Sequence, residues 1–145
     1  MSRLETISNS LFTALRHAPE NRQRAACLAA CEFAVENTGI KSSTVDQALQ
    51  LLRSSKPIPA ELKQNLDTLT QQLDEEYFDL QEAAEDGNAS EEEWKRVFSQ
   101  ARAVSALLFA SGENVLDAAT EAIYEATTTV DDTQELLAVV LKALG

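Results

Sequence analysis

Apolar residues recur every three or four positions along almost the whole chain, and strict alternation of apolar and polar residues is hard to find. Spacing of three and four places apolar side chains on one face of an α-helix, whereas a strand needs a period of two. The four glycines and three prolines fall where the apolar pattern is interrupted. We therefore predict an all-α protein: a single-domain bundle or array of about seven helices in antiparallel hairpins, covering residues 1–145.

Capping residues and helix breakers set the boundaries of these predicted helices. Ser2 with Glu5, and Ser90 with Glu93, have the S-x-x-E spacing of a capping box. Proline suits the first position of a helix, and glycine suits the position after its end. In the first helix we expect a buried stripe of Ile7, Leu11 and Leu15, and in the last helix a cap at Asp131 or Asp132. The predicted helices cover residues 3–17, 19–39, 43–55, 59–86, 90–112, 114–127 and 131–144.

The fourth and fifth predicted helices have the clearest apolar patterns. Leucines at positions 62, 66, 69 and 73 form a stripe in the fourth helix, which is typical of a bundle seam and would also allow a homodimer. The fifth helix is almost wholly apolar from Ala101 to Ala110, interrupted only by Arg102 and Ser105. We expect this helix to be central and buried on most sides.

Charge is distributed unevenly along the chain, whose net charge is −12. Residues 1–63 contain eight bases and six acids, and residues 64–145 contain four bases and eighteen acids. Eleven of those acids lie between Asp67 and Glu93, a segment without any base. Phosphate and anionic lipid repel such a protein, so we expect neither direct nucleic-acid binding nor membrane binding.

The acidic segment has two interpretations. It is either a solvated face that keeps the protein soluble, or a docking surface for a basic partner. Tyr77, Phe78 and Trp94 lie within or beside it. Their helical spacing favours a core position for each, but either Tyr77 or Phe78 must point outward, and Phe78 is the better candidate. The predicted partner-binding residues are Asp74, Glu75, Asp79, Glu82, Glu85, Asp86 and Phe78.

Catalytic and metal chemistry has little support in the sequence. Cys27 and Cys31 share a helix face, but His17 is the only histidine, so a four-ligand zinc site lacks donors. We interpret the two cysteines as small core residues. Glycine-rich phosphate loops and calcium-loop spacing are absent. We therefore expect no enzyme, no metal and no cofactor.

The remaining features concern location and the basic residues. With two cysteines, no 18-residue apolar run and an amphipathic start, we expect a cytoplasmic protein. Arg16, Arg22 and Arg24 cluster around the first interhelical turn, and Arg3 is not far away. They could bind an anion, but we favour pairing with acids of the C-terminal half.

Three segments carry a family resemblance: LDEEYFDLQEAAE, FSQARAVSALLFA and AATEAIYEA, which together cover much of residues 73–126. In size, helix content and acidic character the chain resembles the small all-helical immunity proteins encoded beside bacterial polymorphic toxins. The resemblance supplies no diagnostic motif and no functional residues. It implies a protein that binds a toxin domain and blocks it, often by covering a basic active site.

Charge and resemblance together lead to one main expectation and two alternatives. We expect a cytosolic binding protein whose acidic surface neutralises a basic partner, with a bacterial toxin domain as the target. The first alternative is a nucleic-acid mimic that inhibits a DNA- or RNA-binding protein. The second is a helical adaptor or chaperone without an inhibitory role.

Overall fold

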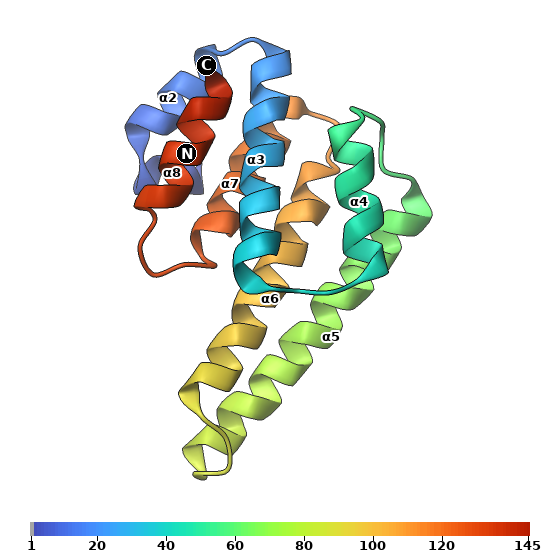
Figure 1. Ribbon diagram of the computed structural model, residues 1–145, viewed down its shortest axis with the longest axis vertical. Helices are drawn as coiled ribbons and strands as arrows, with labels where there is room; N and C mark the ends of the chain where they lie inside the picture. The colour runs from blue at the N-terminus through green and yellow to red at the C-terminus, as the bar shows by residue number, and fades with distance from the viewer. Residues whose placement is uncertain (1) are drawn as a thin grey trace.

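A computed structural model describes residues 2–145, and it contains eight helices and no strand within that range. The all-α prediction is confirmed (Figure 1). Most helix ends fall within one or two residues of the predicted positions. The helices are α1 (Arg3–Ile7), α2 (Asn9–His17), α3 (Glu20–Thr38), α4 (Ser43–Arg53), α5 (Ala60–Glu85), α6 (Glu91–Ala110), α7 (Val115–Thr127) and α8 (Gln134–Leu144).

The first predicted helix is divided in two at Ser8, so that expectation was wrong. Ser8 has extended backbone angles, its N–H donates to the Leu4 carbonyl, and its side chain accepts from the Leu11 N–H. A serine in this position ends one helix and caps the next. The break also changes the buried stripe, because Leu4 is buried and Ile7 is 43% exposed.

The start of α8 also differs from its prediction. Thr133, rather than Asp131 or Asp132, occupies the capping position, and its side chain makes no capping hydrogen bond. The side chain of Asp132 instead accepts from the Gln134 N–H at 3.0 Å. Asp132 therefore satisfies one of the free N–H groups of α8 from just outside the helix.

Helices α3 and α6 form the centre of the body. Helix α3 contacts α2, α4, α6, α7 and α8, and α6 contacts α3, α4, α5 and α7. The prediction that the apolar helix now labelled α6 is central is therefore confirmed, and α3 shares the role. Small buried residues let the helices approach closely, and those of α3 are Ala26, Cys27, Ala30, Cys31 and Ala34.

The leucine stripe of α5 packs inside its own chain. Leu62 and Leu66 belong to the buried core, and Leu69 and Leu73 pack against it. The stripe is therefore largely covered within one copy of the chain, which leaves little of it for the seam of a homodimer. Among residues 2–145, no helix has the length and apolar character needed to cross a membrane.

The ends of α4 and α5 use the same hydrogen-bond pattern with different residues. At the end of α4, the Lys56 N–H donates to the Leu51 carbonyl at 2.9 Å and the Ser55 N–H donates to Leu52 at 3.1 Å. Gly87 occupies the corresponding left-handed position after α5, with φ of 77°. This pattern strongly prefers glycine, yet Ser55 has φ of 53°. Ser55 is therefore held in an unfavourable conformation.

We expect Ser55→Gly to stabilise the protein by about 0.5–1 kcal/mol. The left-handed conformation costs a non-glycine residue about 1–2 kcal/mol, and the additional flexibility of glycine when unfolded offsets part of the gain. Urea denaturation followed by circular dichroism measures the difference. Ser54→Gly is the matched control: Ser54 has φ of −90°, so its replacement should destabilise. Destabilisation by Ser55→Gly would contradict the argument.

Candidate functional site

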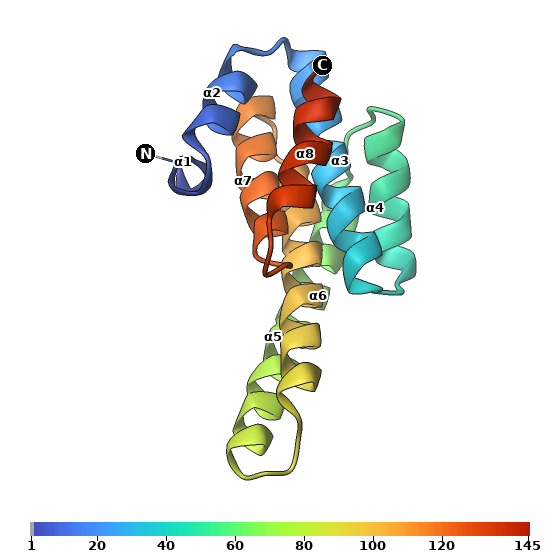
Figure 2. The same ribbon diagram turned by 60° about the vertical axis from the view of Figure 1, so that its left-hand side comes forward.

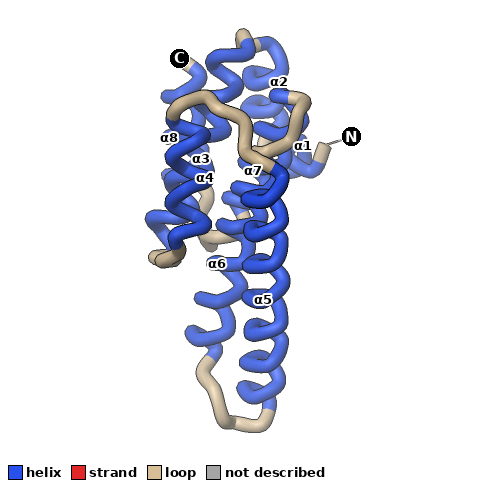
Figure 3. Tube along the Cα trace, turned by 90° about the vertical axis from the view of Figure 1, so that its right-hand side faces the viewer, coloured by secondary structure: helices blue, strands red, loops and turns tan. Residues whose placement is uncertain are grey.

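The lower halves of α5 and α6 extend beyond all the other helices as an antiparallel pair (Figures 1 and 2). The buried core cluster includes no residue between 75 and 101 in the part of the chain that the structure describes. We call residues 75–101 the distal hairpin; the loop at its tip lies far from the body (Figure 3). It contains nine acids and two bases. Most of the acidic segment is thus carried away from the core.

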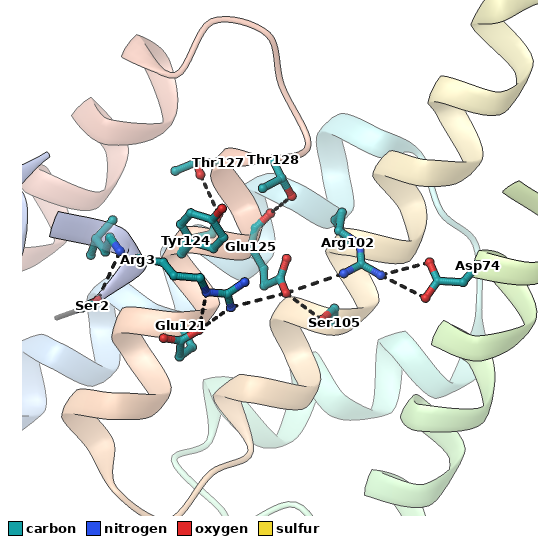
Figure 4. Close-up of polar contacts among 11 residues, drawn as sticks. Ser2, Arg3, Asp74, Arg102, Ser105, Glu121, Tyr124, Glu125, Thr127 and Thr128 are labelled. Atoms are coloured by element: carbon teal, nitrogen blue, oxygen red, sulfur yellow. Dashed lines mark hydrogen bonds and ion pairs between the residues drawn. The ribbon is translucent and has the colours of Figure 1, made fainter. Parts of the chain in front are cut away.

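An ion pair closes the base of the distal hairpin. Arg102 Nη2 on α6 lies 3.0 and 3.1 Å from the two carboxylate oxygens of Asp74 on α5. Behind this pair, Arg102 Nη1 lies 3.7 Å from the Glu125 carboxylate on α7, which is only 4% exposed. The Ser105 hydroxyl donates to the same Glu125 oxygen at 3.2 Å. Arg102 therefore joins three helices at the point where the hairpin leaves the body (Figure 4).

The same network continues to the start of the chain. Arg3 on α1 donates to the Glu121 carboxylate on α7 and lies 3.8 Å from Glu125. Its guanidinium also stacks over the Tyr124 ring at 4.2 Å from the ring centre. The hydrogen bond to Glu121 raises the pKa of Arg3 above its ordinary value. Arg3 therefore holds α1 against α7 and shares with Arg102 the neutralisation of Glu125.

Asp74, one of the predicted docking residues, is only partly exposed and is paired within its own chain. Its carboxylate is neutralised by Arg102 of the same chain, and its side chain is 34% exposed. The reason is its position on α5, at the edge facing α6 and opposite Arg102. Asp74 instead secures the base of the hairpin.

The other predicted acids of α5 are exposed: Glu75, Asp79, Glu82, Glu85 and Asp86. Four of these (75, 79, 82 and 86) have helical spacing of 4, 3 and 4, so they form one row along the outer face. Within residues 2–145, none of the five is paired with a lysine, arginine or histidine. Like charges at such spacing repel by about 0.2–0.5 kcal/mol per pair. The row therefore carries an electrostatic strain that a cationic partner would relieve.

Phe78 lies beside this row and is 60% exposed, as predicted for the outward member of the Tyr77 and Phe78 pair. Tyr77 is less exposed and lies between Phe78 and α6, with the ring centres of Phe78, Phe98 and Trp94 at 4.9, 5.1 and 5.8 Å from its own. These aromatic contacts hold α5 and α6 together where the aliphatic core is absent. Phe78 is left as an exposed ring bordered by carboxylates of its own helix, with Glu75 three positions before it and Glu82 four after.

The basic residues around the first interhelical turn do not behave as one group. Arg3 pairs with acids of the C-terminal half, as predicted. Arg24 instead pairs with Glu20 one turn earlier in its own helix, at 2.9 Å. Arg16 stacks over the Phe12 ring, with 6.0 Å between its guanidinium carbon and the ring centre. Among these basic residues, Arg3 therefore makes the pairs that join the two halves of the chain.

Both cysteines are buried in the core cluster, where they pack as small apolar residues. Hydrogen bonding with the Cys27 thiol, together with burial, raises the pKa of Cys31 well above its usual value. Cys31 therefore stays protonated at neutral pH and is a poor nucleophile. In the described residues, histidine, cysteine and carboxylate side chains form no group of three that could hold a metal ion.

Sequence reasoning missed the roles of Arg102, Ser105 and Glu125, although the sequence contained a signal for two of them. Arg102 and Ser105 are the two interruptions of the apolar run in α6, and they are three positions apart on one helix face. Polar residues in a buried helix need partners. Glu125, the acid that faces both, is 20 residues further along the chain and could not be assigned to them from spacing alone.

The distal hairpin therefore offers a projecting row of unpaired carboxylates and one exposed aromatic ring. Such a surface can bind cations and an apolar side chain. The ion pair between Arg102 and Asp74 at its base holds the hairpin in a defined orientation. Compared with protein-family models, curated proteins and solved structures, the chain matches none.

Proposed function

We propose that this protein is a cytosolic, non-catalytic binding protein that neutralises a basic protein partner with its distal hairpin. The observation that carries the proposal is the unpaired row of carboxylates on the outer face of α5, with Phe78 exposed beside it. Complementary charge would steer a basic partner to the hairpin and raise the association rate. Phe78 would then supply a buried aromatic contact.

The partner we propose is a bacterial toxin domain with a basic active site. This part of the proposal comes from the resemblance of residues 73–126 to immunity proteins. A projecting hairpin suits inhibition, because it can enter a concave active site that a flat surface would only cover at the rim. The exposed ring among the carboxylates favours this interpretation over nucleic-acid mimicry. A surface that imitates a phosphate backbone needs only charged groups, whereas a protein interface also uses apolar contacts.

The test begins with affinity capture from the native organism, using the wild-type chain and a chain with reversed hairpin charge in parallel. A partner retained only by the wild type is purified, and its association rate is measured between 50 and 500 mM NaCl. We expect a steep fall with salt and a loss of the partner's toxic or enzymatic activity in the complex. An association rate independent of salt, or a partner that stays active, would overturn the proposal. Competition by duplex DNA distinguishes a partner that normally binds nucleic acid.

Phe78→Ala should weaken the complex at least tenfold with only a small loss in the stability of the free protein. An aromatic ring at the centre of an interface typically contributes about 2 kcal/mol or more. The ring is 60% exposed in the free chain and its main contact is the Tyr77 ring, 4.9 Å away between centres, so its removal should lower the unfolding free energy by no more than about 1 kcal/mol. Phe109→Ala is the matched control, since Phe109 is 39% exposed on the body. Equal affinity of wild type and Phe78→Ala would place the interface elsewhere.

A further inference from the structure

A cavity of about 490 Å³ lies at the end of the molecule opposite the distal hairpin. It is open to solvent and is bordered by the first half of α3, the linker between α4 and α5, and the turn between α6 and α7, which lie in the upper part of Figure 1. Its volume falls within the range of small-molecule sites, about 300–1,000 Å³. Neither the charge network nor the acidic row contributes a residue to it.

The inner wall of this cavity is apolar. Burial of hydrocarbon against such a wall contributes about 25 cal/mol per Å² of apolar surface removed from water. Cys27 and Ile58 are each 6% exposed, and Ala118 is 8% exposed, so buried side chains form part of this wall. The apolar lining residues include Cys27, Leu28, Leu52, Ile58, Val115 and Ala118.

The charged residues that line the cavity are mostly cations. Arg24, Lys56 and Lys63 are present against a single acid, Glu113. Arg24 is already paired with Glu20, but Lys56 and Lys63 form no ion pair with any residue between 2 and 145. Charges further away than about 8 Å are screened at physiological salt. The hairpin acids at the other end of the molecule therefore do not cancel this local excess of positive charge.

We propose that the cavity binds a small amphipathic carboxylate, with its hydrocarbon chain against the apolar wall and its carboxylate beside Lys56 and Lys63. The two unpaired ammonium groups favour a ligand with a negatively charged head group. The apolar wall favours a ligand whose remaining part is a hydrocarbon chain. A neutral molecule would leave the lysines without a partner, and a cationic one would be repelled. The proposal does not depend on the hairpin or on its partner.

Calorimetric titration of the full chain with octanoate, octan-1-ol and octylammonium tests the charge preference. Octanoate should bind at least tenfold more tightly than octylammonium. The double substitution Lys56→Gln and Lys63→Gln should weaken octanoate binding about tenfold and leave octan-1-ol binding unchanged. Lys41→Gln with Lys142→Gln removes the same charge elsewhere and should have no effect. Absence of octanoate binding, or equal binding of octanoate and octylammonium, would overturn the proposal.

Glycine amide resonances in NMR spectra locate the bound probe. Gly112 lines the cavity, whereas Gly87 lies at the hairpin tip and Gly39 lies after α3. Octanoate should shift the Gly112 resonance and leave those of Gly39 and Gly87 in place. Binding accompanied by shifts at Gly87 or Gly39, but not at Gly112, would show that the carboxylate binds outside this cavity. The lysines replaced in the calorimetric titration are exposed or partly exposed, so their replacement leaves the fold intact.

Discussion

Replacing Arg102 with methionine should lower the free energy of unfolding by about 3 kcal/mol, although Arg102 is a charged residue in an otherwise apolar helix. Glu125 would remain buried, at 4% exposed, with Arg3 at 3.8 Å as its nearest cation. Removing one member of a buried ion pair typically costs about 3–5 kcal/mol, because the charge left behind has lost its partner. Arg102 is itself 22% exposed, which places the expected value at the low end.

The matched variant Glu125→Met should cost only about 1 kcal/mol. Arg102 would keep its two contacts with Asp74, and Arg3 would keep Glu121. Only the Ser105 hydroxyl would lose its acceptor, which is a loss of about 1 kcal/mol. Methionine is close to glutamate in shape and fills the same space. The two replacements differ in cost because Arg102→Met leaves the buried Glu125 carboxylate without its partner, whereas Glu125→Met removes that carboxylate.

Urea denaturation at pH 7 measures both variants and the double variant Arg102→Met with Glu125→Met. We expect the double variant to be more stable than Arg102→Met alone, because the unpaired carboxylate is gone. In Arg102→Met, the backbone amides of residues 75–101 should also exchange their hydrogens faster, because the ion pair between Arg102 on α6 and Asp74 on α5 is lost. Equal destabilisation by the two single replacements would show that Glu125 is not a buried charge.

Reversing the charge of the acidic row should slow association with a basic partner about 100-fold at low salt. The variant replaces Glu75, Asp79, Glu82 and Asp86 with lysine. Steering by complementary charge raises association rates by about 10–1,000-fold, and this change replaces attraction with repulsion. The free chain should keep its stability, since four lysines at this spacing repel each other about as strongly as the four acids that they replace. Stopped-flow mixing with the partner measures the rate.

A control variant separates the row from the overall charge of the protein. Glu36, Asp46, Glu113 and Glu135 are exposed acids of the body, and their replacement by lysine changes the net charge by the same amount. We expect this control to slow association only a few-fold, because these charges are far from the docking face. Equal slowing by both variants would mean that net charge, not the hairpin, governs the encounter.

Helix boundaries were the most predictable feature of this protein, because capping is local chemistry. Ser42, Ser90 and Asn114 cap their helices through side chains that accept from an N–H three residues ahead. Gly39 has the left-handed conformation predicted for a helix end. The break at Ser8 escaped prediction because the apolar spacing of Ile7, Leu11 and Leu15 continues across it. Only the packing of Leu4 into the core explains why Ile7 is left exposed.

The candidate site could be predicted only in part, because a charged residue shows its role through its neighbours in space. The acids at 75, 79, 82, 85 and 86 are exposed as their spacing indicated. Asp74 belongs to the same sequence pattern, yet Arg102 holds it from a helix 28 residues further along. The cationic lining of the cavity likewise comes from α3, the α4–α5 linker and α5, which no local pattern connects.

The sequence by itself determined that the chain is helical, where most helices begin and end, and that negative charge accumulates between Asp67 and Glu93. These properties depend on residues within a few positions of one another. The tertiary structure decided that α5 and α6 extend beyond the other helices, so that the acids project from the body. It also decided that Asp74 is the acid neutralised by Arg102, and that Arg24, Lys56 and Lys63 line one cavity. Both outcomes depend on contacts between helices distant in sequence, and only packing brings those together.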